Sequence, residues 1–123
     1  MQRFLLISLA GALGTGARYL VGLACTRAFG PDFPVGTLVV NVVGCFLIAL
    51  VMQVAARDMI SETTRYVLAT GFMGGLTTYS AFNYESTRFI EQRAWGLVVV
   101  NVGATLFVCV LAGFLGAGLG KRV

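Results

Sequence analysis

The sequence predicts an all-helical integral membrane protein with four transmembrane helices, and the evidence is its composition and the spacing of its charges. Of the 123 residues, 58% are hydrophobic and only 11% are charged. A soluble domain carries about 25% charged residues, so this chain has too few for a water-facing surface. Three long runs contain no charged residue: 33–56, 66–84 and 94–120. Each is close to the roughly 20 apolar residues that a helix needs to cross a bilayer.

The same composition excludes several classes of protein. A nucleic-acid binder gathers its basic residues into one patch, whereas the nine basic residues here are scattered along the chain. Disorder is excluded because the chain is too apolar and too weakly charged. With no histidine and no clustered carboxylates, we expect neither an acid–base pair nor a metal-binding cluster, and the protein is not expected to be an enzyme. The cysteines, at positions 25, 45 and 109, are interpreted as small apolar filler.

The charge-free runs and the polar segments between them define the expected elements of a single membrane domain. The expected spans are about 4–26, 35–56, 66–90 and 95–118. A Gly- and Pro-containing break at 30–34 separates the first two spans, and residues 57–65 form the only polar loop. Ser61 or Thr63 is expected to cap the third helix. Gln92 and Arg93 form the last turn.

Basic residues are almost evenly divided between the two sides of the membrane that four spans imply. One side holds five lysines and arginines, and the other holds two to four. The orientation of a membrane protein follows the excess of these residues on the cytoplasmic side, and this excess is small. The sequence therefore predicts a chain that can insert in both orientations, which makes an antiparallel dimer possible.

Arg18 is the one charge that interrupts the first span. A charged side chain inside a membrane is costly and is a functional candidate by default. Its guanidinium either snorkels to the interface or forms an electropositive vestibule that attracts anions. The sequence leaves both interpretations open.

Two pairs of polar residues follow helical spacing inside the spans. Thr37 and Asn41 are four residues apart, as are Asn101 and Thr105, so each pair lies on one helix face. Hydrogen bonding between helices is one interpretation. The other is a polar track for a desolvated anion, because all four side chains donate hydrogen bonds and none carries a charge.

The third span contains a segment, 71–82, that a plain transmembrane helix does not need. Three glycines are followed by Thr77, Thr78 and Ser80. Close helix packing through Gly71 and Gly75 is one explanation. A helix break is the other, since irregular backbone in a membrane is tolerated inside protein or beside a water-filled cavity.

Two aromatic residues follow in the same segment. Tyr79 and Phe82 are three residues apart, on roughly one face of a helix. Their positive ring edges are able to contact an anion. Ordinary packing is the alternative interpretation.

Taken together, these residues form motifs in the first three spans. The motifs are Gly11-Ala12-Leu13-Gly14 with Arg18-Tyr19, Gly36-Thr37-Leu38 with Asn41, Gly44 and Phe46, and Gly74-Gly75-Leu76-Thr77-Thr78-Tyr79-Ser80-Ala81-Phe82 with Glu85. In this order they closely resemble the Fluc (CrcB-like) fluoride channels. The resemblance covers almost the whole chain, although the fourth span matches only loosely.

The resemblance implies a fold and a function. It implies a fluoride-selective ion channel that passively exports cytoplasmic fluoride across the bacterial inner membrane. It also implies a dual-topology antiparallel homodimer with two fluoride pathways and a helix break in each third span. A structural sodium ion would lie at the dimer centre, held by backbone carbonyls at the break.

The resemblance also assigns roles to positions in this sequence. Gly74 and Thr77 would supply the carbonyl oxygens for sodium. Arg18 matches the family's first-span arginine, and Glu85 matches its third-span acid. The fluoride pathway would contain Thr37, Asn41, Tyr79, Ser80, Phe82, Asn101 and Thr105. Two positions depart from the family pattern, since Tyr79 stands where phenylalanine is usual and Ala81 where threonine is usual.

Two other functions are compatible with a short, apolar four-span chain. A proton-coupled small multidrug-type transporter needs a membrane-buried carboxylate, but the first span has none and Glu85 lies near a span end. A non-conducting structural membrane protein would use the glycines and amides only for packing.

Overall fold

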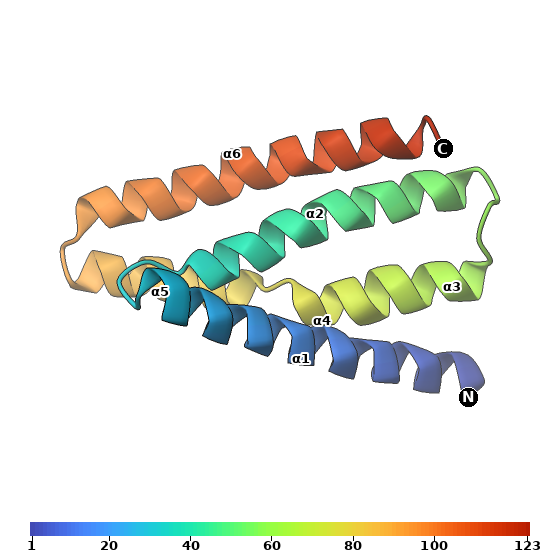
Figure 1. Cartoon of the computed structure of the whole chain (residues 1–123), viewed down its shortest axis with the longest axis horizontal. Coiled ribbons are helices and arrows are strands. Elements are labelled where there is room, and N and C mark those ends of the chain that lie inside the picture. Colours follow the sequence, from blue (N-terminus) through green and yellow to red (C-terminus); the bar gives the residue numbers. More distant parts are fainter.

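The structure is a computed structural model that describes residues 1–123, and all its regular elements are helices (Figure 1). The three long helices are α1 (Gln2–Phe29), α2 (Val35–Ala56) and α6 (Trp95–Gly120). Each is long and apolar enough to cross a membrane. Between α2 and α6 lie four shorter stretches: α3 (Glu62–Tyr66), η1 (Val67–Met73), α4 (Gly74–Leu76) and α5 (Tyr79–Glu91). The all-helical prediction is confirmed, and the third expected span coincides with a divided segment.

Local sequence explains where the helices begin and end. Gly30 follows α1 with a φ of 83°, a left-handed conformation that glycine adopts without strain. Pro34 precedes α2, where its missing N–H costs nothing. Of the two caps considered for the third segment, Ser61 is correct, because its Oγ accepts a hydrogen bond from the Thr64 N–H at 3.1 Å.

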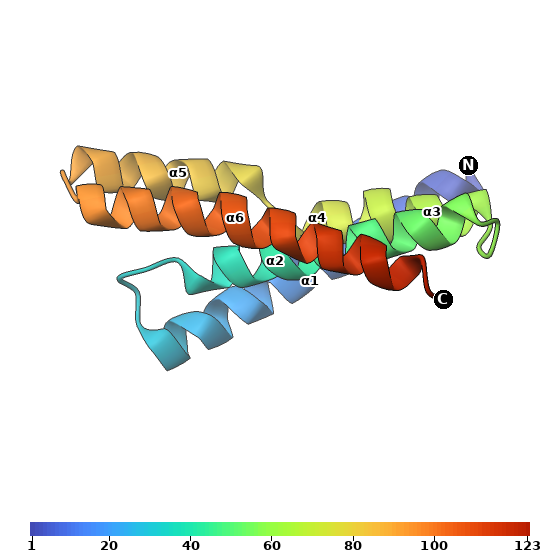
Figure 2. The ribbon, with the colours of Figure 1, turned by 90° about the horizontal axis from the view of Figure 1, so that it is seen from above.

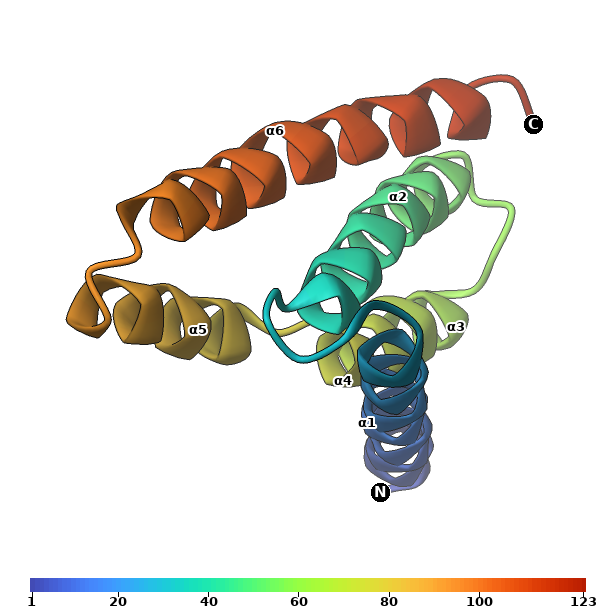
Figure 3. The same ribbon diagram turned by 60° about the vertical axis from the view of Figure 1, so that its left-hand side comes forward.

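The helices pack as two parallel pairs (Figures 1 and 2). α1 runs in the same direction as the segment containing η1 and α4, and α2 runs in the same direction as α6. Figure 3 shows that the C-terminal part of α6 lies beside α2, whereas the N-terminal part of α6 lies beside α5. Successive long segments therefore alternate in direction, which brings residues of α2, α5 and α6 to one region.

Glycines bring the first pair of helices into close contact. A Cβ atom on Gly14 would collide with the backbone of Phe72, and one on Gly75 would collide with the carbonyl of Gly11. A Cβ on Gly71 would lie 2.7 Å from the Ile7 carbonyl oxygen. Small residues at such a contact let two helix backbones approach each other. The packing interpretation of Gly71 and Gly75 is thus confirmed.

Much of the molecular surface is apolar, and few residues are buried. Three of the buried apolar residues, Val40, Met73 and Leu76, form one small cluster. Large apolar side chains of α6, such as Phe107 and Phe114, are 80% and 73% exposed. An apolar surface of this extent suits contact with lipid or with another apolar chain rather than with water.

Candidate functional site

The helical segment 62–91 is interrupted at Thr77 and Thr78. Helix α4 ends at Leu76 and α5 begins at Tyr79 (Figure 1). Both intervening residues have extended backbones, with φ and ψ of −82° and 155° at Thr77 and of −153° and 114° at Thr78. Extended residues cannot continue the helical hydrogen-bond ladder, so the backbone groups around them need other partners.

Asn41 of α2 supplies the partners for Thr78. The Thr78 N–H donates to Asn41 Oδ1 at 2.8 Å, and Asn41 Nδ2 donates to the Thr78 carbonyl at 3.1 Å. The amide thus pairs with both backbone groups of one residue, as a neighbouring β-strand would. Asn41 is only 9% exposed. Asn41 therefore bonds mainly to the interruption of the neighbouring segment. The spacing between Thr37 and Asn41 in the sequence did not reveal this partner.

The interruption changes the partners of several backbone carbonyls. In a continuous helix, the Gly74 carbonyl would accept from the Thr78 N–H and the Thr77 carbonyl from the Ala81 N–H. Here the Thr78 N–H donates to Asn41, and the Ala81 N–H donates to Thr78 Oγ1 at 3.1 Å. Gly74 and Thr77 therefore lose their helical donors. Carbonyls freed in this way coordinate cations in other membrane proteins.

Arg18 contacts another of these carbonyls, that of Gly75. Its Nε donates to the Gly75 carbonyl at 3.0 Å, which links α1 to the interrupted segment. Arg18 also lines an open hollow of about 420 Å³ together with Thr15, Tyr19, Gly22 and Leu23. The backbone contact was not anticipated from the sequence, because it depends on how closely the glycines let α1 approach α4.

A groove of about 430 Å³ lies between α2, the interruption and α6. Six residues that the sequence assigned to ion binding line it: Asn41, Gly74, Thr77, Tyr79, Phe82 and Thr105. Gly44 also lines the groove, and a Cβ atom there would collide with Thr77 Cγ2. Most of the remaining lining is apolar, including Ile48, Leu106 and Val110. The groove thus combines few polar groups with a largely apolar wall, as binding sites for small ligands do.

The two aromatic residues meet at the edge of this groove. The ring centroids of Tyr79 and Phe82 are 5.7 Å apart, and the ring planes are inclined by 54°. Tyr79 is 77% exposed. Ser80 is also exposed and shares a hydrogen bond of 3.1 Å with Thr78 Oγ1. Ser80 therefore contacts the interruption through Thr78 but does not line the groove.

Asn101 takes part in a separate polar contact between α5 and α6. Its Nδ2 donates to Ser86 Oγ at 3.0 Å, and that hydroxyl donates to the Phe82 carbonyl at 2.8 Å. Asn101 is 2% exposed and does not line the groove, whereas Thr105 does. Sequence reasoning missed Ser86. Its one signal was its position four residues after Phe82, on the same helix face.

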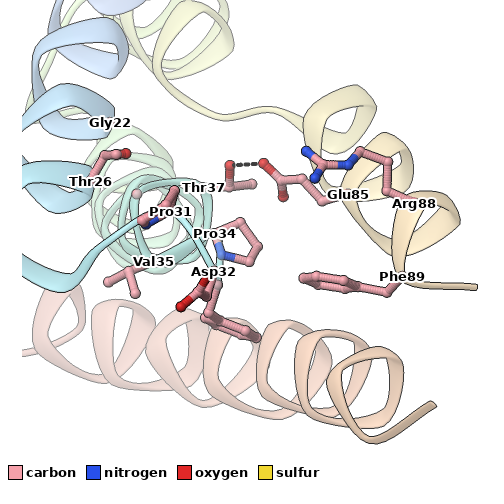
Figure 4. A pocket seen from close by; sticks show the side chains of 12 residues that line it. Gly22, Thr26, Pro31, Asp32, Pro34, Val35, Thr37, Glu85, Arg88 and Phe89 are labelled. Carbon is pink, nitrogen blue, oxygen red and sulfur yellow. Dashed lines mark hydrogen bonds between the residues drawn. The ribbon is translucent and has the colours of Figure 1, made fainter. Parts of the chain in front are cut away.

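Thr37 is also separated from the groove. Its Oγ1 donates to Glu85 Oε1 at 2.6 Å in a second cavity of about 300 Å³, near the loop between α1 and α2 (Figure 4). Figure 4 shows Arg88 beside this carboxylate. The other carboxylate oxygen of Glu85 is buried and has no hydrogen-bond partner. Thr37 and Asn41 were predicted to share one helix face, but they contact different groups: Thr37 bonds to Glu85, and Asn41 bonds to Thr78.

Comparisons with known proteins give a consistent result. Residues 5–117 match the model of the family described as CrcB-like protein, Camphor Resistance (CrcB). The chain is 47% identical to the fluoride-specific ion channel FluC of Sorangium cellulosum (strain So ce56), over 100% of this chain and 98% of that protein. It is 48% identical to FluC of Anaeromyxobacter sp. (strain K), over 93% and 91% of the two chains. It is 41% identical to FluC of Agrobacterium fabrum (strain C58 / ATCC 33970), over 100% and 99%.

Proposed function

The chain belongs to the CrcB-like family of fluoride-specific ion channels, and from this premise we propose that it exports fluoride through the groove between α2 and α6. It is a multi-pass bacterial membrane protein and not an enzyme. Family membership decides against the multidrug-type transporter and the non-conducting structural protein. The inner membrane is the location we propose, because passive export of a cytoplasmic ion requires a path across that membrane.

The main observation in support of this pathway is that uncharged hydrogen-bond donors and aromatic rings line the same groove. Fluoride is small and strongly hydrated, so several donors must replace its water at once, as filter carbonyls do for cations. Asn41 uses one Nδ2 hydrogen on Thr78, and its amide has a second. Thr105 adds a hydroxyl, and Phe82 adds a ring edge. None of these groups carries the positive charge that would trap an anion.

Ser80, Thr37 and Asn101 extend the proposed pathway beyond the groove. Ser80 lies next to Tyr79 at the groove's edge, and Asn101 reaches Phe82 through Ser86. Thr37 lies one helical turn from Asn41, in the cavity that Figure 4 shows. We assign Arg18 to the vestibule, where the hollow beside α1 would collect anions before they enter.

We assign a structural sodium ion to the carbonyls of Gly74 and Thr77. Both have lost their helical donors, and both line the groove. Two carbonyls are too few to surround a cation. A second chain related by a two-fold axis would present the same pair and double the number of oxygens.

The proposed assembly is an antiparallel homodimer in which each chain crosses the membrane four times. Segment 62–91 would be the third, interrupted span, and the alternating directions of the long segments support this assignment. The nearly even division of basic residues supports insertion in both orientations. Exposed apolar side chains on α6 would be covered by lipid and by the second chain.

Fluoride efflux from proteoliposomes, followed with a fluoride electrode, tests the groove. We expect Asn41→Asp and Phe82→Ile to abolish most efflux, because one places a negative charge in the pathway and the other removes a ring edge. Asn83→Asp and Phe4→Ile are matched controls, since both residues are exposed and do not line the groove. Wild-type efflux in both groove variants would show that the pathway lies elsewhere.

A further inference from the structure

Two thiols from distant parts of the chain face the same groove. Cys45 of α2 and Cys109 of α6 both line it. The two helices pack closely here, because a Cβ atom on Gly113, one turn after Cys109, would lie 3.9 Å from the Cys45 carbonyl oxygen. Both are partly exposed, and neither forms a disulfide. The third cysteine, Cys25 of α1, is also a free thiol but does not line the groove. The proposed conduction of fluoride gives no task to the pair.

A thioether completes a set of three sulfur side chains around this space. Met73 lines the same groove and is only 4% exposed, so its position is fixed by the core. The lining contains no carboxylate, histidine or other charged side chain. Calcium and magnesium bind through six or more oxygen ligands. Zinc also binds thiolates, but its structural sites use four cysteine or histidine ligands and this lining offers two cysteines and no histidine. Thiolates combined with a thioether favour Cu(I) and related soft cations.

We propose that Cys45 and Cys109, with Met73 as an additional neutral ligand, bind one soft monovalent cation of the Cu(I) type. The thiolate is the form of cysteine that coordinates metals, so each thiol releases its proton to the solvent when the ion binds. No electron is transferred in this step, and the Met73 thioether coordinates the ion without gaining or losing a proton. The sequence spacing gave no sign of this site, because close packing of α2 on α6 brings the two cysteines together.

Silver(I) is the probe for the site, since it shares the preference of Cu(I) for sulfur and does not need a reductant. Calorimetric titration of the purified full-length protein, in chloride-free buffer, should give a tightest binding step of one Ag⁺ per chain, separate from any weaker binding at the lone thiol of Cys25. Repeating it in buffers with different ionisation enthalpies should show about two protons released per ion, one from each thiol. A stoichiometry near zero, or no proton release, would overturn the proposal.

Substitutions locate the ligands. Losing a hydrogen-bond partner of a metal ligand already costs about 10–100-fold in affinity, so Cys45→Ser and Cys109→Ser should each weaken Ag⁺ binding by more than about 100-fold. Met73→Leu should weaken it by a smaller factor and keep the stoichiometry. Cys25→Ser is the matched control and should keep the tightest binding step of the wild type. Undiminished binding in Cys45→Ser or Cys109→Ser, or lost binding in Cys25→Ser, would place the site elsewhere. Circular dichroism shows whether each variant keeps its helices.

A second readout rests on the proposed function. A cation held by Cys45 and Cys109 would occupy the groove beside Thr77, so Ag⁺ should block fluoride efflux from proteoliposomes and dithiothreitol should restore it. Cys109→Ser should conduct fluoride and resist Ag⁺. If Ag⁺ binds through the two thiols but efflux continues, the metal site stands and the groove is not the fluoride pathway. If Ag⁺ blocks efflux equally in wild type and Cys109→Ser, the thiol site is refuted.

Discussion

The amide of Asn41 forms two hydrogen bonds with the backbone of Thr78, of 2.8 Å and 3.1 Å, and this pairing holds the helix interruption in place. Some Ser and Thr side chains bond within their own segment, as Ser61 does with Thr64. Asn41 instead reaches from α2 across to another helical segment. The extended backbone at Thr78 therefore depends on a residue far away in sequence.

We expect Asn41→Ala to lower the free energy of unfolding by about 2–6 kcal/mol, because two backbone groups of Thr78 lose their partners and each such loss costs about 1–3 kcal/mol. Unfolding in mixed detergent, followed through the single tryptophan, Trp95, measures the change. Asn83→Ala is the control and should change stability by less than about 0.5 kcal/mol, since Asn83 is exposed. Similar losses in the two variants would mean that the amide does not stabilise the interruption.

Gly44 and Thr77 are predicted to be coupled through steric contact. A Cβ atom at Gly44 would collide with Thr77 Cγ2, and overpacking of this kind costs about 1–3 kcal/mol. Gly44→Ala should therefore destabilise the protein and reduce fluoride efflux. Thr77→Ser removes the methyl group and keeps the hydroxyl, so adding it to Gly44→Ala should restore stability.

Gly103→Ala is the control for this pair, because no atom lies within 4 Å of a Cβ at Gly103. The same unfolding measurement, made on both single variants and the double variant, gives the coupling energy. If the double variant is no more stable than Gly44→Ala alone, the Thr77 methyl group is not the obstacle.

Composition and charge spacing predicted the all-helical membrane fold, because a bilayer imposes strict limits on length and polarity. The same reasoning left packing and a helix break as alternatives for segment 71–82. The structure contains both features, since Gly71 and Gly75 contact α1 while Thr77 and Thr78 leave the helix. Glycine serves both purposes, so its presence alone did not distinguish them.

Helical spacing identified polar faces but not their partners. Thr37 and Asn41 lie four residues, or about 6 Å, apart along α2. At that distance the crossing segment presents different groups, so Thr37 meets Glu85 and Asn41 meets Thr78. Asn101 and Thr105 diverge for the same reason. The crossing of the helices, which one sequence does not reveal, determines which polar groups meet.

Ser86 and Asn101 are predicted to stabilise the contact between α5 and α6 as a unit. Their hydrogen bond of 3.0 Å is buried, so Ser86→Ala leaves the Asn101 amide without this partner. A double-mutant cycle with Asn101→Ala should give a coupling energy of about 0.5–3 kcal/mol, the range for residues in direct contact. Strictly additive losses would contradict this prediction. Thr87→Ala, at an exposed neighbouring position, is the control.

The last prediction separates the ring of Tyr79 from its hydroxyl. If the ring edge contacts fluoride, Tyr79→Phe should leave the efflux rate within about twofold of wild type, because phenylalanine keeps the same edge and quadrupole. Tyr79→Ile removes the ring and its contact with Phe82, whose centroid is 5.7 Å away. An aromatic contact is worth about 0.5–1.5 kcal/mol, so efflux should fall by up to about tenfold, the factor that corresponds to 1.4 kcal/mol.

Tyr84→Ile is the matched control, because Tyr84 is also exposed on α5 but does not line the groove. Proteoliposome efflux with a fluoride electrode compares the three variants under one gradient. A large gain in Tyr79→Phe would show that the hydroxyl obstructs the pathway, and a large loss would show that it is a required donor. Either result would contradict a role for the ring edge alone, because only the hydroxyl differs between tyrosine and phenylalanine.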